Sequence, residues 1–273
     1  MYIRTLFFGM EFYQQCFWIT GAASGMGRAL ALLLAGYQPK LILTDRDPQG
    51  LQEVAEEAGR RGATVITRVL DMSESASIAA LAAEVIGLAG RIHGLYQFAG
   101  ISQRSLVVET PDANDRRIME VNFFGVVALA KAVLPHMIAC GGGQLAVTSS
   151  LVGKFGFPYR SAYSASKHAL HGYFESLRAE NSRHNIRVSI LIPGRIQTNI
   201  SRFALDKEGK EYGKMDPGQA NGITAEKAAR QILKGLRREK KEVHVGGNEL
   251  MMLYIRRFLP ALYYRLSTRI RPV

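Results

Sequence analysis

The sequence predicts an α/β fold in which helices cover both faces of a doubly wound, Rossmann-like parallel sheet. β-prone apolar runs alternate with helix-forming stretches along the 273 residues, and glycine or polar residues stand where several of these runs end. Such alternation is typical of parallel strands joined by right-handed helical crossovers. We expect about seven strands in the order 3-2-1-4-5-6-7, with a ligand at their carboxyl ends where the order reverses.

The expected elements follow one another regularly. The strands are expected at residues 15–20, 40–44, 63–70, 92–98, 144–148, 186–192 and 242–245. The helices are expected at about 26–36, 48–60, 74–89, 114–139, 161–182 and 224–238, with Thr224 capping the last.

One long polar segment, residues 195–223, interrupts this alternation. Long loops at a ligand-binding face are often lids. We expect this segment to shape a substrate pocket together with Phe155, Phe157, Pro158 and Tyr159. Packing in the protein core is the alternative explanation for these aromatic residues.

The first strand ends in a glycine-rich turn, Thr20-Gly21-Ala22-Ala23-Ser24-Gly25-Met26-Gly27. Glycine lets the backbone approach a ligand closely, and the following helix offers unpaired N–H groups to a phosphate. The spacing G-x-x-x-G-x-G differs from the usual G-x-G-x-x-G. Tight strand–helix packing is the alternative reason for the glycines. We predict that a dinucleotide binds at Thr20, Gly21, Ser24, Gly25, Met26 and Gly27.

A carboxylate after the second strand bears on the choice of dinucleotide. Asp45 stands 24 residues after Gly21 and 18 after Gly27, which brackets the spacing of about 20 residues typical of an acid that binds the adenosine ribose. A carboxylate there would repel a 2′-phosphate, so NAD is favoured over NADP. Arg46 follows directly and could contact a phosphate instead, which leaves NADP as the alternative.

Tyr163 and Lys167 form the second motif, in the run Tyr163-Ser164-Ala165-Ser166-Lys167. Positions four apart share one face of a helix, so the ammonium can lie near the phenol. A nearby positive charge lowers the pKa of a phenol from about 10 toward the range useful for proton transfer. A surface helix with an incidental Tyr and Lys would give the same pattern, but the glycine turn upstream favours catalysis.

Taken together, these motifs resemble the short-chain dehydrogenase/reductase family, from about Phe17 to Val245. The run 158–170 most resembles the branch of hydroxysteroid dehydrogenases and related membrane-associated reductases. The matching positions, in order, are Thr20–Gly27, Asp45, Asp71, Ala99-Gly100, Asn122, Ser149-Ser150, Tyr163–Lys167, and Pro193-Gly194 followed by Thr198.

The resemblance implies four catalytic residues and no metal. Tyr163 would be the general acid/base, and Lys167 would lower its pKa and hold the nicotinamide ribose. Ser150 would bind the reacting oxygen, because it lies 13 residues before Tyr163, the family's usual interval. Asn122 would support a proton-relay water. Further cofactor contacts are implied for Asp45, Arg46, Asp71, Ala99, Gly100, Tyr163, Lys167, Pro193, Gly194, Ile196 and Thr198.

One position departs from the family pattern. Relatives commonly read Asn-Asn-Ala-Gly at the end of the fourth strand, whereas this chain reads Gln97-Phe98-Ala99-Gly100. Phe98 cannot supply amide hydrogen bonds near the cofactor, which puts the local geometry and cofactor affinity in doubt more than the chemistry.

These residues predict hydride transfer between a nicotinamide and a carbonyl or secondary alcohol, on a lipophilic substrate that is steroid-like, acyl or sphingoid. The first alternative is a dinucleotide-binding scaffold or sensor without turnover, which only Phe98 supports. The second is an epimerase or lyase, disfavoured by the glycine spacing and the short region after residue 193. By the resemblance we also expect a homodimer or homotetramer paired through the helices near 114–139 and 161–182.

Composition fits one domain over residues 1–249, with residues 1–9 as an extension and residues 250–273 as a basic, apolar tail. Cys16 and Cys140 are the two cysteines, so neither a disulfide framework nor a zinc site is expected and a reducing cytoplasm is the expected compartment. The N-terminal residues lack the cleavage site of a signal peptide.

The net charge of +12 is concentrated late in the chain: residues 230–273 contain eleven Lys or Arg against three Glu, a balance of +8. Arg256, Arg257 and Pro260 argue against a transmembrane helix in the tail. We expect either peripheral contact of residues 250–273 with an anionic membrane, or a tail folded over the substrate mouth or a dimer interface. Nucleic-acid binding is not expected, because no motif for it is present.

Overall fold

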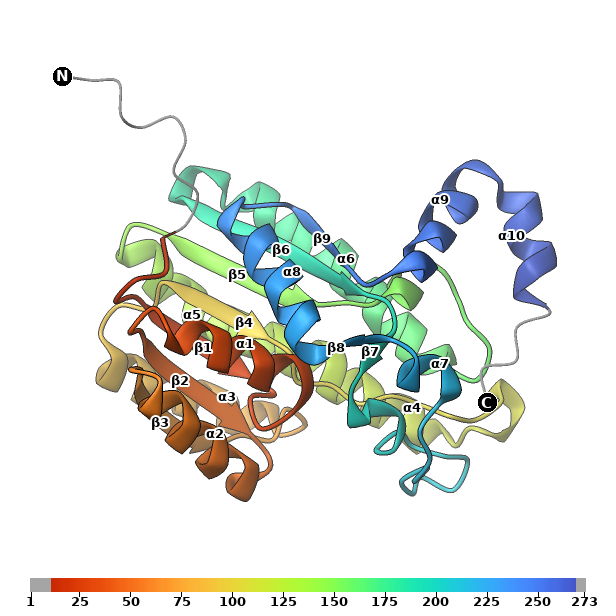
Figure 1. The fold of residues 1–273 in the computed structure, drawn as a ribbon, viewed down its shortest axis with the longest axis horizontal. Helices are drawn as coiled ribbons and strands as arrows, with labels where there is room; N and C mark the ends of the chain where they lie inside the picture. The colour runs from red at the N-terminus through yellow and green to blue at the C-terminus, as the bar shows by residue number, and fades with distance from the viewer. Residues whose placement is uncertain (1–10, 269–273) are drawn as a thin grey trace.

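Seven parallel strands form the central sheet of the protein, whose computed structural model describes residues 11–268 (Figure 1). The predicted N-terminal extension, residues 1–9, and the end of the tail, 269–273, lie outside the described residues. The strands are β1 (Cys16–Thr20), β2 (Lys40–Asp45), β3 (Thr64–Val69), β4 (Gly94–Gln97), β5 (Gly143–Thr148), β6 (Ile186–Pro193) and β9 (Glu242–Val245).

The strands are arranged in the order β3-β2-β1-β4-β5-β6-β9, and all neighbours pair in parallel. Since β9 is the seventh strand of this sheet along the chain, the predicted fold class and strand order are confirmed. The order reverses between β1 and β4, the position at which ligands of such sheets bind.

Two helical layers cover the sheet. The main helices are α1 (Gly25–Ala35), α2 (Pro48–Arg60), α3 (Ser75–Ala89), α4 (Asp112–Met119), α5 (Gly125–Ala139), α6 (Ser161–Glu180) and α8 (Ala225–Arg237). Successive side chains of a strand point to opposite faces. Phe17 and Ile19 therefore pack with α1, α2 and α8, whereas Trp18 packs with α3, α5 and α6. Burial on both faces explains the continuous apolar runs of the central strands.

The helix expected at residues 114–139 is divided in the structure. α4 and α5 are joined by a π-helical turn, η2 (Glu120–Phe124), which contains Asn122. Gly125 follows directly, and a Cβ there would collide with the carbonyl oxygen of Met72. Single π turns inside helices frequently occur at functional sites. The whole stretch Asp112–Ala139 is apolar and long enough to span a membrane by composition and length, but one side of α5 lies in the core beneath the sheet.

The lid segment, residues 195–223, is tied down rather than free. Its two ends pair with each other as β7 (Ile196–Gln197) and β8 (Ile223–Thr224), and it contains the short helix α7 (Pro217–Ala220). In its middle, Leu205 exchanges backbone hydrogen bonds with Ser102 and Arg104 at 2.9 and 2.7 Å. As predicted, the side chain of Thr224 caps α8 by accepting from Lys227 N.

The tail forms two short helices, α9 (Met251–Phe258) and α10 (Pro260–Ser267), which we call the tail hairpin (Figure 1). Tyr263 is buried, its ring centroid lies 5.1 Å from that of Phe155, and its hydroxyl donates to Gly156 O at 2.9 Å. Tyr163 belongs to the same apolar cluster. The hairpin therefore lies beside the predicted catalytic tyrosine.

Candidate active site

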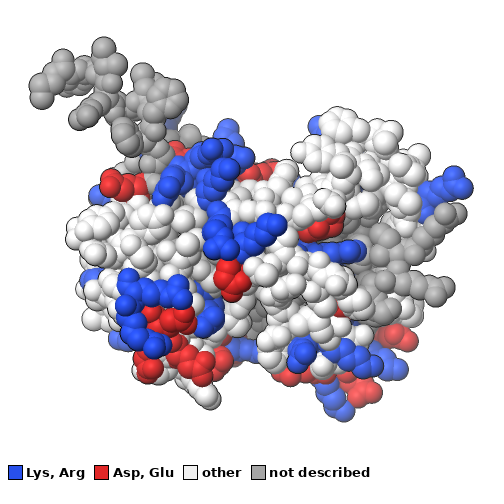
Figure 2. All heavy atoms as spheres, viewed as in Figure 1, with Lys and Arg blue, Asp and Glu red and all other residues white. Residues whose placement is uncertain are grey.

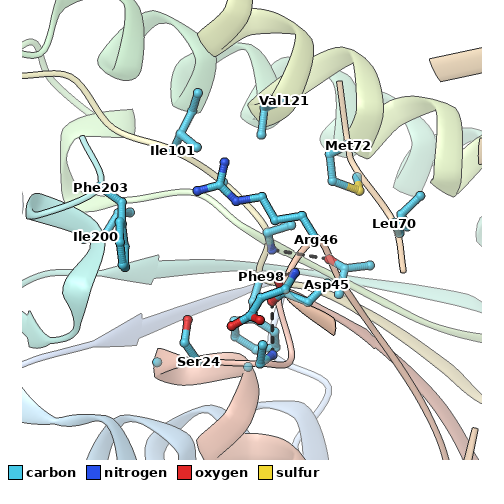
Figure 3. A pocket seen from close by; sticks show the side chains of 18 of the residues that line it. Ser24, Asp45, Arg46, Leu70, Met72, Phe98, Ile101, Val121, Ile200 and Phe203 are labelled. Atoms are coloured by element: carbon cyan, nitrogen blue, oxygen red, sulfur yellow. Dashed lines mark hydrogen bonds between the residues drawn. The ribbon is translucent and has the colours of Figure 1, made fainter. Parts of the chain in front are cut away.

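A cavity of about 470 Å³ opens at the carboxyl ends of β1, β2 and β4, where the strand order reverses (Figure 3). The lid segment contributes Thr198 and Phe203 to its wall. Most residues predicted to bind the cofactor line it: Thr20, Gly21, Ser24, Gly25, Met26, Gly27, Asp45, Arg46, Asp71, Ala99, Gly100 and Thr198.

The glycines of the turn are required by its geometry. Gly21 has φ of +65°, and a Cβ there would lie 2.6 Å from Ala99 N. A Cβ on Gly27 would collide with the carbonyl oxygen of Gly21. Ser24 precedes α1 without giving it a side-chain cap. The first N–H groups of α1 therefore remain available to an anion at the positive end of the helix dipole. Tight packing and a cradle for phosphate thus coexist in this turn.

Asp45 connects the glycine turn to the second strand. Its Oδ2 accepts from Ala23 N at 3.1 Å, and its Oδ1 accepts from Asp47 N at 3.2 Å. Figure 3 shows the side chain of Arg46 extending across the cavity, away from Ser24. The cavity therefore contains both a carboxylate and a guanidinium at the carboxyl end of β2.

Asp71 lies at the same edge of the sheet. Burial raises the pKa of its carboxyl, but hydrogen bonds from the backbone and hydroxyl of Ser73, followed by the charges of Arg46 and Arg117, outweigh burial and bring the pKa below its usual value. Asp71 is therefore held ionised, and its carboxylate can accept hydrogen bonds from a ligand in the cavity.

Phe98 also lines the cavity, in the position where an amide was expected from the family pattern. Neither Oε1 nor Nε2 of the neighbouring Gln97 has a hydrogen-bond partner among the described residues, although Gln97 is buried. The side-chain hydrogen bonds expected at the end of this strand are thus absent from the part of the chain that the structure describes.

The four predicted catalytic residues converge behind this cavity. Tyr163 and Lys167 lie one turn apart on α6, and Ser150, which follows β5, hydrogen-bonds to the phenol of Tyr163. Lys167 Nζ donates to Thr148 O at 2.7 Å and lies 5.7 Å from the centroid of the Tyr163 ring. Asn122 accepts from Ile101 N and donates to Ile101 O, each at 2.9 Å.

Gly100 joins the two halves of the site. A Cβ on this glycine, at the end of β4, would lie 3.0 Å from Asn122 Oδ1 and 3.4 Å from Lys167 Nζ. Gly100 itself lines the cavity, so the predicted catalytic residues lie directly next to the cavity. The donor groups of the glycine turn, the carboxylates of Asp45 and Asp71, and Lys167 form a set of residues that fits a dinucleotide.

The two adjacent serines point to different partners. Ser149 Oγ donates to Lys167 O at 3.0 Å and lies 2.8 Å from His171 Nε2. Ser150 Oγ accepts from Val152 N at 3.3 Å and bonds to Tyr163. Ser150 is thus placed at the phenol, whereas Ser149 supports the helix behind it.

A family profile described as short chain dehydrogenase matches residues 15–209 of this chain. The protein belongs to the short-chain dehydrogenase/reductase family. The chain is 40% identical over 254 residues to "Dehydrogenase/reductase SDR family member 7B" of Danio rerio, covering 90% of this chain and 82% of the relative. It is 41% identical to "Dehydrogenase/reductase SDR family protein 7-like" of Anopheles gambiae, covering 90% and 80%.

Solved structures agree with this assignment. A short chain dehydrogenase/reductase from Burkholderia phymatum in complex with NAD superposes with a TM-score of 0.82 at 23% identity, covering 97% of this chain and 98% of that one. A short-chain dehydrogenase from Streptomyces avermitilis superposes with a TM-score of 0.77 at 29% identity, covering 93% and 96%. The predicted family is confirmed, and the protein is a nicotinamide-dependent oxidoreductase.

The predicted effect of Lys167 on Tyr163 differs from what this structure shows. Burial raises the pKa of the Tyr163 phenol above 10.0, and the influences that lower it are the Ser150 hydrogen bond and the charges of Arg160 and Arg104. The Lys167 ammonium donates to Thr148 O and lies over the face of the Tyr163 ring. Burial also lowers the pKa of Lys167 to about 7.

Five residues predicted to bind the cofactor do not line the cavity: Tyr163 and Lys167, which lie on α6, and Pro193, Gly194 and Ile196. Pro193 is the last residue of β6, Gly194 N donates to Val245 O at 2.8 Å, and Ile196 is buried in β7. These positions fix the base of the lid segment, because they turn the chain from β6 toward Thr198.

Three charged residues near the site were not singled out from the sequence: the buried Arg104 and Asp216 and the partly buried Arg160. Their ion pairs join positions that are up to 112 residues apart. The one available signal was the place of Arg160, three residues before Tyr163.

The depressed pKa of Lys167 predicts a pH-dependent stability. Its pKa is about 7 in the folded protein and about 10.4 in an unfolded chain. Between these values the unfolded state binds more protons, so this group makes the folded protein more stable as the pH rises. We expect Lys167→Met to remove that rise, which denaturant unfolding of the cofactor-free protein between pH 6.5 and 9.5 would measure.

The matched control is Lys131→Met, because Lys131 is exposed on α5. It should unfold with the pH dependence of the unmodified protein. An identical pH dependence for Lys167→Met and the unmodified protein would contradict the buried, partly neutral state of Lys167.

Proposed function

We propose that the protein transfers a hydride between a nicotinamide cofactor and a carbonyl or secondary alcohol carbon, with Tyr163 as the general acid/base. The observation that carries this proposal is the convergence of Tyr163, Ser150, Lys167 and Asn122 beside the dinucleotide cavity. The bound nicotinamide supplies the redox chemistry. In reduction the Tyr163 hydroxyl donates a proton to the substrate oxygen, and in oxidation it accepts one.

The neighbouring residues serve this proton transfer. Ser150 hydrogen-bonds to Tyr163 and is placed to orient the substrate oxygen beside it. Lys167, whose pKa is about 7, exchanges protons readily near neutral pH and holds the nicotinamide ribose. Asn122 is fixed by Ile101 and lies next to Gly100, where it supports a relay water between Lys167 and solvent.

Replacing the proton donor tests this proposal. We expect Tyr163→Phe to lower turnover by about 10²–10⁴-fold, the usual contribution of a general acid/base, while cofactor affinity is retained. The measurement is absorbance of the reduced nicotinamide with a panel of ketones and alcohols. The control is Tyr173→Phe on the same helix, in a ring contact with Phe174 outside the catalytic group.

The same assay separates the alternatives. Cofactor binding without consumption for every compound would indicate a scaffold or sensor, and product formed without net consumption would indicate an epimerase. Full activity of Tyr163→Phe would remove the assigned role of Tyr163.

We further propose that NAD is preferred over NADP. The Asp45 carboxylate lines the cavity at the end of β2, where it can accept from the adenosine ribose and repel a 2′-phosphate. Arg46 extends into the same cavity (Figure 3) and is the group that would favour NADP. We favour Asp45 because backbone hydrogen bonds hold its carboxylate in place.

A titration with both reduced cofactors tests this preference. NADH should bind more tightly than NADPH, and Asp45→Asn, which loses the charge and keeps one of the two acceptor oxygens, should narrow the difference by about tenfold, since 1.4 kcal/mol corresponds to that ratio. Glu53→Gln, exposed on α2, should leave the ratio unchanged. Tighter NADPH binding by the unmodified protein would reverse the assignment.

We propose a lipophilic substrate and peripheral contact of a cytoplasmic enzyme with an anionic membrane through the tail hairpin. Phe258 is 72% exposed, Tyr254 56% and Leu259 55%. Arg256, Arg257 and Arg265 provide positive charge on the same two helices. The region over α9 is largely uncharged in Figure 2, as expected of a surface that enters a lipid interface. Because Tyr263 of this hairpin packs in the cluster of Tyr163, lipid contact and substrate entry would coincide.

Vesicle sedimentation tests the membrane contact. We expect the protein to sediment with phosphatidylserine-containing vesicles, and Arg257→Glu combined with Phe258→Ser to release it, because both side chains are exposed. The matched control is Arg91→Glu combined with Leu88→Ser, which are exposed at the opposite, amino-terminal edge of the sheet. Equal sedimentation of the two double variants would exclude the hairpin as the contact.

We also propose pairing of copies through α5 and α6, as a homodimer or homotetramer. Phe124, which precedes α5, is 47% exposed. The neighbouring ring of Phe123 lies edge-on to Tyr173 of α6, with centroids 6.0 Å apart. An exposed aromatic group at the junction of these two helices supports an interface there.

A further inference from the structure

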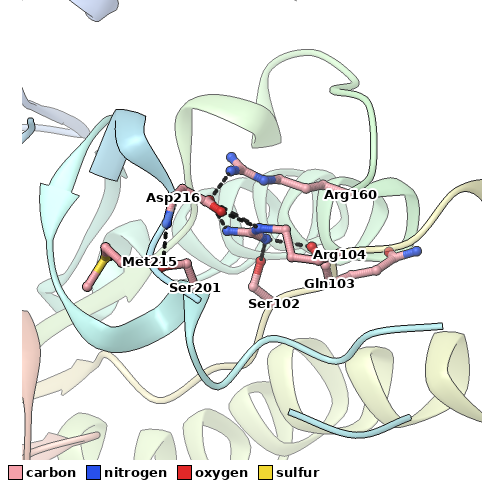
Figure 4. A network of polar contacts seen from close by, with 7 residues as sticks. All are labelled: Ser102, Gln103, Arg104, Arg160, Ser201, Met215 and Asp216. Carbon is pink, nitrogen blue, oxygen red and sulfur yellow. Dashed lines mark hydrogen bonds and ion pairs between the residues drawn. The ribbon is translucent and has the colours of Figure 1, made fainter. Parts of the chain in front are cut away.

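Two buried charged residues, Arg104 and Asp216, form a network with the partly buried Arg160 beside the catalytic tyrosine (Figure 4). Arg104 follows β4, Asp216 belongs to the lid segment, and Arg160 directly precedes α6. Arg104 Nε lies 3.1 Å from both carboxylate oxygens of Asp216, and Arg160 Nη2 lies 2.8 Å from Asp216 Oδ2. One carboxylate thus serves two guanidinium groups.

The two arginines differ in how fully they are bound. Arg104 uses Nε and Nη2 for Asp216 and Nη1 for Ser102 Oγ and Gln103 O, and 2% of its side chain is exposed. The side chain of Arg160 makes one hydrogen bond among the described residues, to Asp216, and its buried Nε has no partner there. Its side chain is 20% exposed. The hydrogen bonds of Arg104 therefore hold the protein structure together, whereas the guanidinium of Arg160 retains N–H donors that no described residue accepts.

The network also carries a surplus positive charge. Asp216 is the one carboxylate that forms an ion pair with Arg104 or Arg160 within residues 11–268. An uncompensated charge away from water is costly unless a partner neutralises it. Accordingly, burial first and then the charge of Arg104 lower the pKa of Arg160 to about 10. A negatively charged ligand beside Arg160 would neutralise this surplus positive charge.

The surroundings of Arg160 place such a ligand in the substrate region. Its guanidinium lies 5.1 Å from the centroid of the Phe157 ring, and Phe157 packs against the cluster of Tyr163 and Tyr263. Arg160 is three residues before Tyr163, so both lie at the first turn of α6. A substrate whose carbonyl meets Tyr163 would have a neighbouring group within reach of Arg160 and its remainder against apolar side chains.

We propose that Arg160 binds an oxyanion of the substrate, a carboxylate or a phosphate, close to the reacting carbonyl. The inference rests on the proposed hydride transfer and narrows its substrate class to apolar molecules with an anionic group near the ketone. A guanidinium matches either oxyanion with paired, charge-assisted hydrogen bonds. Asp216 would then be a positioning residue that aims Arg160 from the lid segment.

A pair of probes that differ in one charge tests the proposal: 2-oxo-4-phenylbutanoate and its ethyl ester. In the cofactor-loaded protein we expect kcat/KM for the acid to exceed that for the ester by about 10–100-fold, the ratio that charged hydrogen bonds of this kind produce. Arg160→Gln should remove this ratio, mainly through KM of the acid. Arg160→Lys should restore part of it, and Arg202→Gln, exposed in the lid segment, should leave it unchanged.

Binding is measured separately in Tyr163→Phe loaded with cofactor, so that failure of the chemistry and failure of the inference are distinguishable. The acid should raise the melting temperature and the ester should not, and adding Arg160→Gln should abolish the shift. A shift with inorganic phosphate but not with the acid would identify phosphate as the group bound. No shift with either anion, or an acid-to-ester ratio near one in the unmodified protein, would overturn the proposal whether or not the ketone is reduced.

Discussion

The approach of the glycine turn to the end of β4 is the constraint on which the rest of the site depends. Phe98 N donates to Thr20 O at 3.2 Å, and Ala99 N donates to Thr20 Oγ1 at 3.3 Å. Gly21 must lack a Cβ for these two segments to meet. Gly100, the next residue of the loop that follows β4, then lies close to Asn122 and Lys167. One backbone contact thus fixes the distance between the dinucleotide cradle and the groups that move the proton.

The sequence could predict the fold and most of the cradle because both depend on local patterns. Alternating apolar runs define parallel strands, and glycines at a strand–helix junction define a phosphate site. Twelve predicted contacts therefore lie around one cavity. The catalytic roles of Tyr163, Ser150, Lys167 and Asn122 are predictions from the family resemblance. Their convergence depends on the packing of α6 and the π turn beside the end of β5, since only Ser150 directly follows a strand.

What the sequence could not predict depends on contacts between distant residues. The π turn around Asn122 is followed by Gly125, which packs against Met72. The periodicity of apolar residues along a helix does not predict such a contact with a distant residue. The direction of Lys167 is likewise set by Thr148, on a strand 19 residues earlier. The pairing of Arg104 with Asp216 joins residues 112 positions apart. In each case tertiary packing decided the outcome, not local propensity.

Burial and charge act on Tyr163 in opposite directions, which links the lid segment to the proton transfer. Burial raises the pKa of the phenol, while Arg160 and Arg104 lower it, and Asp216 offsets part of their charge through its ion pairs. Any change that moves Asp216 away would leave two cations near Tyr163 and favour its phenolate. Conversely, a negative group at Arg160 would favour the protonated phenol, the form that donates to a carbonyl. The position of Asp216 in the lid segment and the charge near Arg160 therefore influence whether Tyr163 is ready to act as an acid or as a base.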